Sequence, residues 1–586
     1  MRRVVGISAV LSGFLFATVF ADSWPQWGRD AQHWGFSPVA GQSPSRILAD
    51  IVYDPFSAQE QAEAGGFLLT HFQAPIVDQN DVFMTFKTGR YVSCDPPRSG
   101  SPAPCGAAAW DQQVWNVKQL HWVHNLLATG WTFPSDWKPL PNSAELAGWE
   151  PVFHPALSGD FVYVPGAGGS VWKVRRDNGQ AVSLNPFGTV DPLTFVAGPL
   201  TIDNSGSVYY NVVKSDPANP SGGPPTFTDV PGAWLVKISD PASARPLYQM
   251  VSYKTLIPDA PRQCAGVFAG SNSTLPPSAD AVPPSMPCGS QRPGINVAPA
   301  VGPDGTIYSV SRAHGPRAAG ERYSYLIAVN PNLTLKWAAS LRDRLNDGCN
   351  NDTGTFAGAW FGANGTPTGC RLGTTPGVDP QTNQLPAGRV TDLGTSSPVV
   401  APDGSILYGA QTSYNGSRGH MFRFTAAGSF AGAYGFGWDT TPAIYPHDGT
   451  FSVIVKDNTY GRNASGEETG PFHIRQLSAD LSKIEWSFKS TNTRSCRRVS
   501  ASRLVCADDH PNGFEWCINA PAVDVRGDVY VNGEDGKLYV IGQGGIERAS
   551  VFTNLALGAA YTPLALGPDG RIYTQNDGHL FVIGSR

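Results

Sequence analysis

The sequence predicts an all-β fold: a single eight-bladed β-propeller of four-stranded blades, closed by an N-terminal strand, with disulfide-stapled insertions on one face. Three observations predict this fold. One short hairpin pattern recurs along the whole chain, and the spacing of its copies matches a propeller blade. Gly and Pro, which favour turns over long helices, account for 65 and 50 of the 586 residues.

The recurring pattern is a short hairpin with a proline at its start. Clear copies read APAVGPDGTIYSVS (298–311) and TPLALGPDGRIYTQN (562–576). Each has Pro, an apolar run, an acidic or Gly turn, and a second apolar run that often holds Tyr. Pro is tolerated because it opens the innermost strand and interrupts no ladder. The inner strands are predicted to start near the prolines at 75, 155, 199, 299, 398, 442, 521 and 563.

The spacing of these prolines indicates blades. Three of the seven intervals are 42 to 44 residues, the length of a four-stranded blade, and the longer intervals contain insertions. Two further strands follow the hairpin, as in GKLYVIGQGGIERASVF (536–552). The eighth copy has only three strands before Arg586, so SRILADIVYDPF (45–56) is expected to supply the fourth. That pairing removes two exposed sheet edges.

The first residues are typical of a secretory signal. Arg2 and Arg3 precede an apolar stretch, and Val19-Phe20-Ala21 offers small residues for cleavage. We therefore expect a signal peptide over 1–21 and the propeller over 22–586. No cysteine follows for lipid attachment, and no later run is long enough to span a bilayer. The interpretation is a secreted or periplasmic, monomeric protein, from a bacterial or a eukaryotic source.

Nine cysteines fit an oxidising compartment. They fall into near neighbours that are expected to staple loops: Cys94 and Cys105, Cys264 and Cys288, Cys349 and Cys370, then Cys496, Cys506 and Cys517, of which one is left over. No Cys-x-x-Cys spacing occurs, so no metal site is assigned. The insertions that hold these cysteines are expected on one face, at 87–106, 252–297, 340–396 and 489–519.

The charge distribution does not indicate a nucleic-acid-binding protein. The formal net charge is −5, and only 15% of the residues are charged. The densest basic stretch is interpreted as a solvated loop; it contains Arg494, Arg497, Arg498 and Arg503.

Polar residues just before the inner-strand prolines are expected to crowd the channel mouth on the insertion face. These ligand-facing candidates are Gln73, His154, Asn296, Asp392, Asp439 and Asn519, with Trp438 nearby. Their oxygens could hold Ca²⁺ or a polar ligand. They could equally satisfy buried backbone groups. Asp392 and Asp439 flank consecutive blades, so we expect them to lie close together.

A family resemblance adds to this picture. SWPQWGRDAQHWGFSPVA (23–40), followed by repeats such as GKLYVIGQGG, resembles the PQQ-like (quinoprotein-type) β-propeller proteins over nearly the whole chain. That superfamily includes PQQ-dependent alcohol dehydrogenases and cofactor-free scaffolds of the outer-membrane assembly machinery. For an enzyme, the resemblance implies PQQ, Ca²⁺, a catalytic Asp and two adjacent cysteines. No Cys-Cys pair exists here.

The sequence leaves three functions open. The first is an exported binding or scaffold protein that presents its loop-decorated face to a protein, peptide or polymer. The alternative is a PQQ- and Ca²⁺-dependent oxidoreductase for alcohols, sugars or aldehydes, with its cofactor at the channel. The third is a polysaccharide hydrolase or lyase that uses Asp392 and Asp439 as an acid/base pair. No catalytic residue and no resident cofactor are assigned from the residues themselves.

Overall fold

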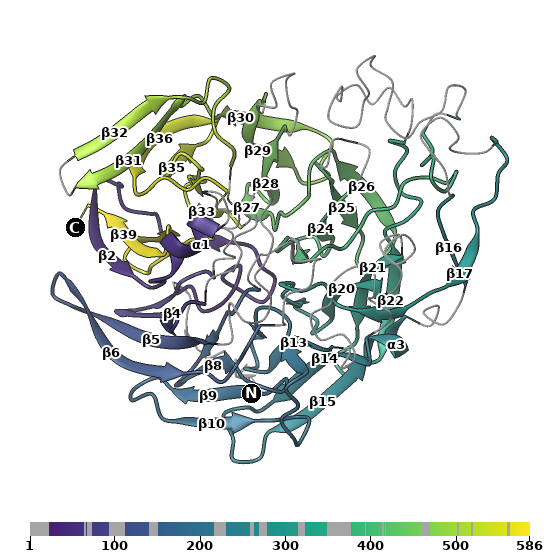
Figure 1. Ribbon diagram of the computed structural model, residues 1–586, viewed down its shortest axis with the longest axis horizontal. Helices are drawn as coiled ribbons and strands as arrows, with labels where there is room; N and C mark the ends of the chain where they lie inside the picture. The colour runs from purple at the N-terminus through teal and green to yellow at the C-terminus, as the bar shows by residue number, and fades with distance from the viewer. Residues whose placement is uncertain are drawn as a thin grey trace, which may run out of the picture.

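Eight β-sheets radiate around a common axis and form the predicted eight-bladed propeller (Figure 1). The computed structural model describes residues 23–63, 66, 73–92, 112–139, 151–215, 230–257, 263–268, 278–314, 323–348, 375, 377–392, 394–412, 415, 418–459, 469–500, 503–516, 518, 520–558 and 563–585. Within each blade the strands follow one another outward as antiparallel neighbours. The fold class predicted from the sequence is therefore confirmed.

The blades use the strands in chain order. Blades one to three contain β3 (Ile76–Asp78), β4 (Asp81–Gly89), β5 (Gln113–Val123) and β6 (Leu126–Pro134); β7 (Ala156–Ser158), β8 (Phe161–Pro165), β9 (Val171–Arg175) and β10 (Ala181–Leu184); then β12 (Thr201–Ile202), β13 (Val208–Lys214), β14 (Gly232–Ser239) and β15 (Leu247–Ser252). Blades four and five contain β19 (Ala300–Val301), β20 (Ile307–His314), β21 (Ser324–Val329) and β22 (Leu335–Ser340); then β23 (Val399–Val400), β24 (Ile406–Ala410), β25 (His420–Phe424) and β26 (Phe430–Tyr434).

Blades six to eight complete the ring. They contain β27 (Ala443–His447), β28 (Thr450–Asn458), β29 (Phe472–Ser478) and β30 (Ile484–Lys489); β33 (Ala522–Asp524), β34 (Val529–Asn532), β35 (Lys537–Gly542) and β36 (Ile546–Phe552); then β37 (Ala565–Leu566), β38 (Ile572–Asn576), β39 (His579–Gly584) and β2 (Arg46–Val52). The remaining elements are β1 (Phe36–Ser37), β11 (Thr194–Val196), β16 (Gln263–Ala265), β17 (Ser285–Pro287), β18 (Ser290–Arg292), β31 (Arg494–Ser500), β32 (Arg503–Asp508), α1 (Ser57–Glu63) and α3 (Tyr253–Leu256).

The Pro-Asp-Gly motif forms the turn between the first two strands of a blade. In the fifth blade, Gly404 adopts a φ of 79°, which a residue with a side chain rarely adopts. The carboxylate of Asp403 accepts the backbone N–H of Ser405 at 2.9 Å. Asp304 and Asp569 make the same bond in their own turns. This local chemistry explains why the pattern repeats, and each inner strand begins one or two residues after its predicted proline.

The first and last strands close the ring, as expected. The N-terminal strand β2 pairs antiparallel with β39 near the C-terminus, with Arg46 opposite Gly584 and Val52 opposite His579. The eighth blade is thus assembled from both ends of the chain, and the two strands lie side by side in Figure 1. The prediction that residues 45–56 supply the fourth strand is confirmed.

The segment before β2 runs around the inside of the ring and touches all eight blades in order. Its hydrogen bonds to seven inner strands, and to the turn after the eighth, are 2.6 to 3.0 Å long. They join Trp24 to Val77, Pro25 to Leu157, Gln26 to Ile202, Ala31 to Val301, Gln32 to Val400, Trp34 to Ile444, Gly35 to Val523 and Gln42 to Gly570. We call residues 23–42 the axial segment. It lies at the inner strands and leaves at the face of the Pro-Asp-Gly turns, opposite the insertions.

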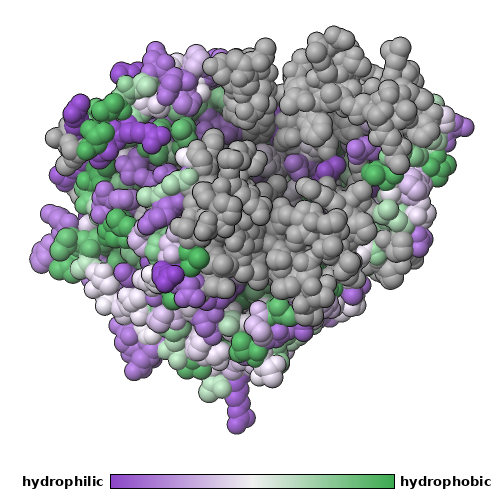
Figure 2. Space-filling view, viewed as in Figure 1, coloured by the Kyte–Doolittle hydropathy of each residue, from purple (hydrophilic) through white to green (hydrophobic). Residues whose placement is uncertain are grey.

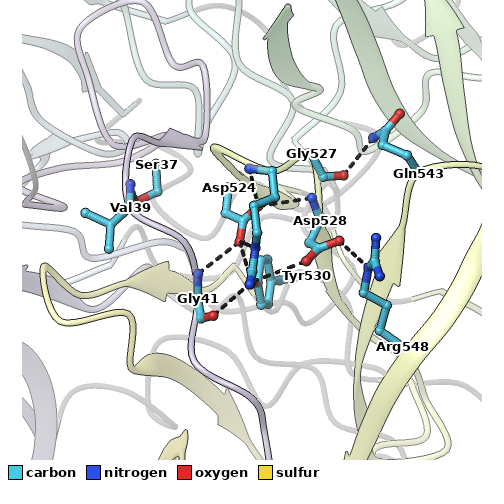
Figure 3. Close-up of polar contacts among 10 residues, drawn as sticks. Ser37, Val39, Gly41, Asp524, Gly527, Asp528, Tyr530, Gln543 and Arg548 are labelled. Atoms are coloured by element: carbon cyan, nitrogen blue, oxygen red, sulfur yellow. Dashed lines mark hydrogen bonds and ion pairs between the residues drawn. The ribbon is translucent and has the colours of Figure 1, made fainter.

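The exit of the axial segment is held by the seventh blade (Figure 3). The N–H of Gly41 donates to Asp524 Oδ2 at 2.9 Å, and the Tyr530 hydroxyl donates to the same oxygen at 2.9 Å. Beside them, Arg548 Nε lies 2.6 Å from Asp528 Oδ1. Burial and the neighbouring Asp524 raise the pKa of Asp528, while Arg548 opposes that shift. The arrangement ties the N-terminal segment to a late blade.

Two insertions form disulfide-bonded hairpins outside the blades. The β16–β17 hairpin contains the disulfide Cys264–Cys288, and the β31–β32 hairpin contains Cys496–Cys506. The basic stretch around Arg497 is therefore an ordered hairpin, not the loop expected from the sequence. The other predicted disulfide residues, Cys94, Cys105, Cys349, Cys370 and Cys517, lie outside the described residues. In the described ranges, no helix is long and apolar enough to cross a membrane.

Candidate functional site

The residues predicted at the channel mouth are almost completely buried. Their exposed fractions are 5% for Gln73, 0% for His154 and Asn296, 1% for Asp392 and 3% for Asp439. Trp438 is half-buried, and Asn519 lies outside the described residues. The decisive question is therefore whether their polar atoms are already bonded within the protein.

Asp392 is bonded on both carboxylate oxygens. Oδ1 accepts Arg292 Nη1 at 3.0 Å and the backbone N–H of Ile295 at 2.8 Å. Oδ2 accepts Arg292 Nη2 and lies 3.3 Å from Arg312 Nη1. All three charged groups are buried, so each needs the others to offset the loss of solvent. Asp392 thus joins the fourth blade to the loop that leads into the fifth.

Asp439 pairs with the ammonium group of Lys456. Lys456 Nζ lies 3.1 Å from Oδ2, and the N–H of Thr395 donates to Oδ1 at 2.9 Å. Burial raises the pKa of Asp439 to about 6, against the opposing effect of Lys456. Asp392 and Asp439 both hold the loop that includes Thr395, but each pairs with a different cation. Their direct proximity, which the sequence suggested, stays a prediction.

Asn296 bridges two neighbouring loops. It has a φ of 70°, in the left-handed region. Its Oδ1 accepts the N–H of Val152 at 2.7 Å, and its Nδ2 lies 3.5 Å from the backbone oxygen of Asp392. The side chain therefore satisfies buried backbone groups, which was one of the two roles considered for these residues.

His154 and Gln73 differ from this pattern. Both ring nitrogens of His154 and the Oε1 of Gln73 are buried without a hydrogen-bond partner among the described residues. Burial lowers the pKa of His154 to about 4, so the ring is neutral at pH 7. The indole of Trp27 meets this ring edge-on, with 5.6 Å between centroids.

The axial segment fills the channel next to His154. Trp27 packs against Ala298 and Ala520, which precede inner strands on different sides of the ring. His33 Nδ1 lies 2.8 Å from the backbone oxygen of Pro398, and its Nε2 lies 3.4 Å from Thr201 Oγ1. Burial lowers the pKa of His33 to about 4 as well. The channel is thus packed with the chain's own side chains.

The residues predicted at the mouth do not fit the Ca²⁺ and PQQ that the resemblance implies. Ca²⁺ takes six to eight oxygen ligands. Here the oxygens of Asp392 accept guanidinium and backbone donors, Asp439 Oδ2 faces an ammonium group, and Asn296 Oδ1 accepts a backbone N–H. No cluster of three or more His, Cys, Asp or Glu side chains with metal-binding spacing occurs in the described part of the chain.

A separate cavity of about 450 Å³ lies on the insertion face. Its walls come from segments that connect strands or blades: helix α1, strand β31, the link between blades seven and eight, and the β38–β39 turn. The lining residues are Gln61, Gly66, Arg497, Arg498, Val499, Asn554, Leu555, Leu557 and Asp577. In Figure 1 the β31–β32 hairpin lies beside β36 and β2, at the upper left. The volume is in the range of small-molecule sites.

The hairpin is held over this cavity by specific contacts. The guanidinium of Arg498 lies 5.8 Å from the ring centroid of Phe552, on the outer strand of blade seven. At the hairpin base, Asn492 Nδ2 donates to Asp535 Oδ2 at 2.8 Å. Across the cavity, burial raises the pKa of Asp577, and the charges of His579 and Arg497 oppose that shift. The cavity therefore has a cationic wall and an acidic wall.

Sequence reasoning found neither the axial segment nor the cavity. The only signal for the axial segment was an aromatic stretch, residues 24–36, that precedes the first repeat and does not follow the repeat pattern. The cavity had no local signal, since α1, β31 and the 554–557 link are far apart in sequence.

No protein-family model and no curated protein matches this sequence. Solved structures do match. A europium-containing methanol dehydrogenase is 10% identical, with 94% of this chain and 89% of that chain covered and a TM-score of 0.47. A quinohemoprotein alcohol dehydrogenase from Pseudomonas putida is 11% identical, with 96% and 76% covered and a TM-score of 0.47. BamB from Moraxella catarrhalis is 11% identical, with 92% and 99% covered and a TM-score of 0.36. These likenesses concern the fold alone.

Proposed function

We propose that this protein is an exported binding protein that uses the propeller as a rigid support and takes its ligand in the cavity on the insertion face. One observation carries the proposal. The cavity of about 450 Å³ is built from connecting segments outside the regular blades, on the face with the disulfide-bonded hairpins. Binding residues are often found on loops held by a rigid scaffold.

The state of the channel supports the same conclusion. The polar side-chain atoms of Asp392, Asp439 and Asn296 are already hydrogen-bonded within the protein. The side chains of Trp27 and His33 fill the channel. A ligand at the channel would have to displace these contacts. The insertion-face cavity requires no such rearrangement.

The proposal is tested with the full mature chain and a ligand panel. Short peptides, organic acids, neutral sugars and phosphates are scored by thermal shift, and hits are measured by isothermal titration calorimetry. We expect at least one class to bind the wild type and to lose binding in Leu555→Trp, which fills the cavity. The matched control is Val182→Trp, on the exposed outer strand β10, where the side chain is 60% exposed.

The same experiment includes the oxidoreductase alternative. PQQ with Ca²⁺ is titrated by quinone absorbance, and dye-linked oxidation of alcohols, sugars and aldehydes is followed. Stoichiometric PQQ binding with turnover would overturn the binding-protein proposal. Equal ligand binding by the wild type and Leu555→Trp would show that the cavity is not the site.

A further inference from the structure

We propose that the insertion-face cavity recognises a carboxylate at the end of an apolar, peptide-like ligand, and that Arg497 holds this carboxylate. The inference rests on the proposed function and specifies the ligand of that site. It follows from the charge, the apolar surface and the amide groups of the cavity wall.

Arg497 provides the charge. It is exposed on β31 and lines the cavity, and among the described residues it makes no salt bridge within 4 Å. Burial raises the pKa of Asp577 across the cavity and the charge of Arg497 opposes that rise, but the two residues make no salt bridge at that distance limit. A guanidinium offers two parallel N–H groups that match a carboxylate. Arg498 differs, because its guanidinium packs beside Phe552.

The rest of the wall favours an apolar body with amide groups. Leu555, Leu557 and Val499 supply apolar surface, and Val499 is 56% exposed, so a ligand that covers it removes this surface from water. The side-chain amides of Gln61 and Asn554 can each donate to and accept from a ligand amide. Among the described lining residues none is aromatic.

The surroundings of the cavity match this chemistry. Figure 2 shows hydrophilic and hydrophobic residues interleaved at the upper left, where Figure 1 places the β31–β32 hairpin. Exposed apolar side chains on this hairpin include Val499, Leu504 and Val505, at 56%, 42% and 47%. Arginines lie on the same two strands: Arg494, Arg497 and Arg498 on β31 and Arg503 on β32. A cationic group on the hairpin side of the cavity would be repelled by these arginines.

The test uses N-acetyl-leucyl-leucine and its C-terminal amide, which differ only in the carboxylate. Calorimetry on the wild-type protein should show the acid binding about tenfold or more tightly than the amide, as expected for a charge-assisted hydrogen bond. Raising the NaCl concentration should weaken only the binding of the acid, because salt screens the guanidinium. Acetyl-Gly-Gly-Leu-Leu has the same C-terminal Leu-Leu carboxylate on a longer chain. If it binds more tightly than N-acetyl-leucyl-leucine, the ligand is a peptide C-terminus; if the two bind equally, the ligand is a small acid.

Variants of the hairpin test the role of Arg497. Arg497→Gln should reduce the affinity for the acid to that for the amide, and Arg497→Lys should restore part of it. The control is Arg503→Gln, on the same hairpin but outside the cavity wall, which should bind as the wild type does. Three outcomes would each overturn the inference. They are equal affinity of the wild type for the acid and the amide, equal losses of affinity in Arg497→Gln and Arg503→Gln, and no binding of the acid. If another panel ligand still binds and is lost in Leu555→Trp, the proposed function survives.

Discussion

Arg292 and Asp392 are one hundred residues apart in sequence, yet Arg292 Nη1 lies 3.0 Å from Asp392 Oδ1 inside the protein. The second bond of the pair, from Nη2 to Oδ2, makes the contact bidentate. Arg312 adds a second positive charge at Oδ2. This buried cluster joins consecutive blades and gives Asp392 a structural role.

Asp392→Asn should destabilise the protein strongly. The change leaves Arg292 and Arg312 buried without their carboxylate, and removing one partner of a buried pair costs about 3 to 5 kcal/mol. Urea unfolding followed by circular dichroism should show a clearly lower midpoint. The control is Asp403→Asn, whose partner Arg423 lies near the surface and whose loss should cost about 1 kcal/mol or less. Similar midpoints for the two variants would contradict the structural role of Asp392.

Trp27→Ala should destabilise the whole ring. Trp27 is fully buried against Ala298 and Ala520, on different sides of the axis. Truncating a buried tryptophan costs about 3 to 5 kcal/mol, because apolar contacts are lost and a cavity remains. Thermal unfolding should shift to lower temperature. Val182→Ala, on an outer strand, is the control and should leave the transition in place. An unchanged transition for Trp27→Ala would show that the axial segment does not support the blades.

Buried histidines should make the protein sensitive to mild acid. Burial lowers the pKa of His154 from 6.5 to about 4, so the folded state binds fewer protons than the unfolded state between these values. The contribution to stability is therefore complete above about pH 6.5 and is lost as the pH falls to about 4. The loss amounts to about 3 kcal/mol for one such group.

The variant His154→Leu tests this linkage. Its stability relative to the wild type should rise as the pH falls from 7 to 4, because leucine has no proton to bind. Urea midpoints at several pH values check the trend. A wild-type profile that runs parallel to that of the variant would contradict a lowered pKa at His154. The experiment compares the stabilities of the variant and the wild type at each pH, because other groups also titrate between pH 7 and 4. Burial raises the pKa of Asp439 to about 6, so this residue stabilises the folded state as the pH falls.

The Cys496–Cys506 disulfide should protect the hairpin more than it protects the ring. The two residues are direct cross-strand partners in a two-stranded sheet outside the blades. In Cys496→Ser/Cys506→Ser, trypsin should cut faster after Arg497, Arg498 or Arg503, since opening the hairpin exposes its backbone. Mass spectrometry locates the cuts. The thermal unfolding temperature of the blades should change little. If the variant loses thermal stability as strongly as it loses resistance to trypsin, the disulfide does not protect the hairpin selectively.

The number of blades, the closing strand and the inner-strand positions could be predicted from the sequence. Each depends on short-range chemistry that repeats: a proline before the strand, an apolar run, and an Asp-Gly turn such as that at Asp403. Residues 45–56 could be assigned to the last blade because a three-stranded end needs a partner. The same register predicts that Asn296 and Asp392 lie near the mouth, and this placement stays a prediction.

The burial and the ion-pair partners of these residues depend on the tertiary structure alone. Nothing local to Asp392 indicates that Arg292 neutralises it, or that Lys456 faces Asp439, because these partners come from other strands and other blades. The axial segment carries no repeat, so its path through the ring has no sequence period. The cavity needs α1, β31 and the 554–557 link together. Repeated local preferences determine the scaffold, whereas burial and pairing between distant segments determine which polar groups remain available to a ligand.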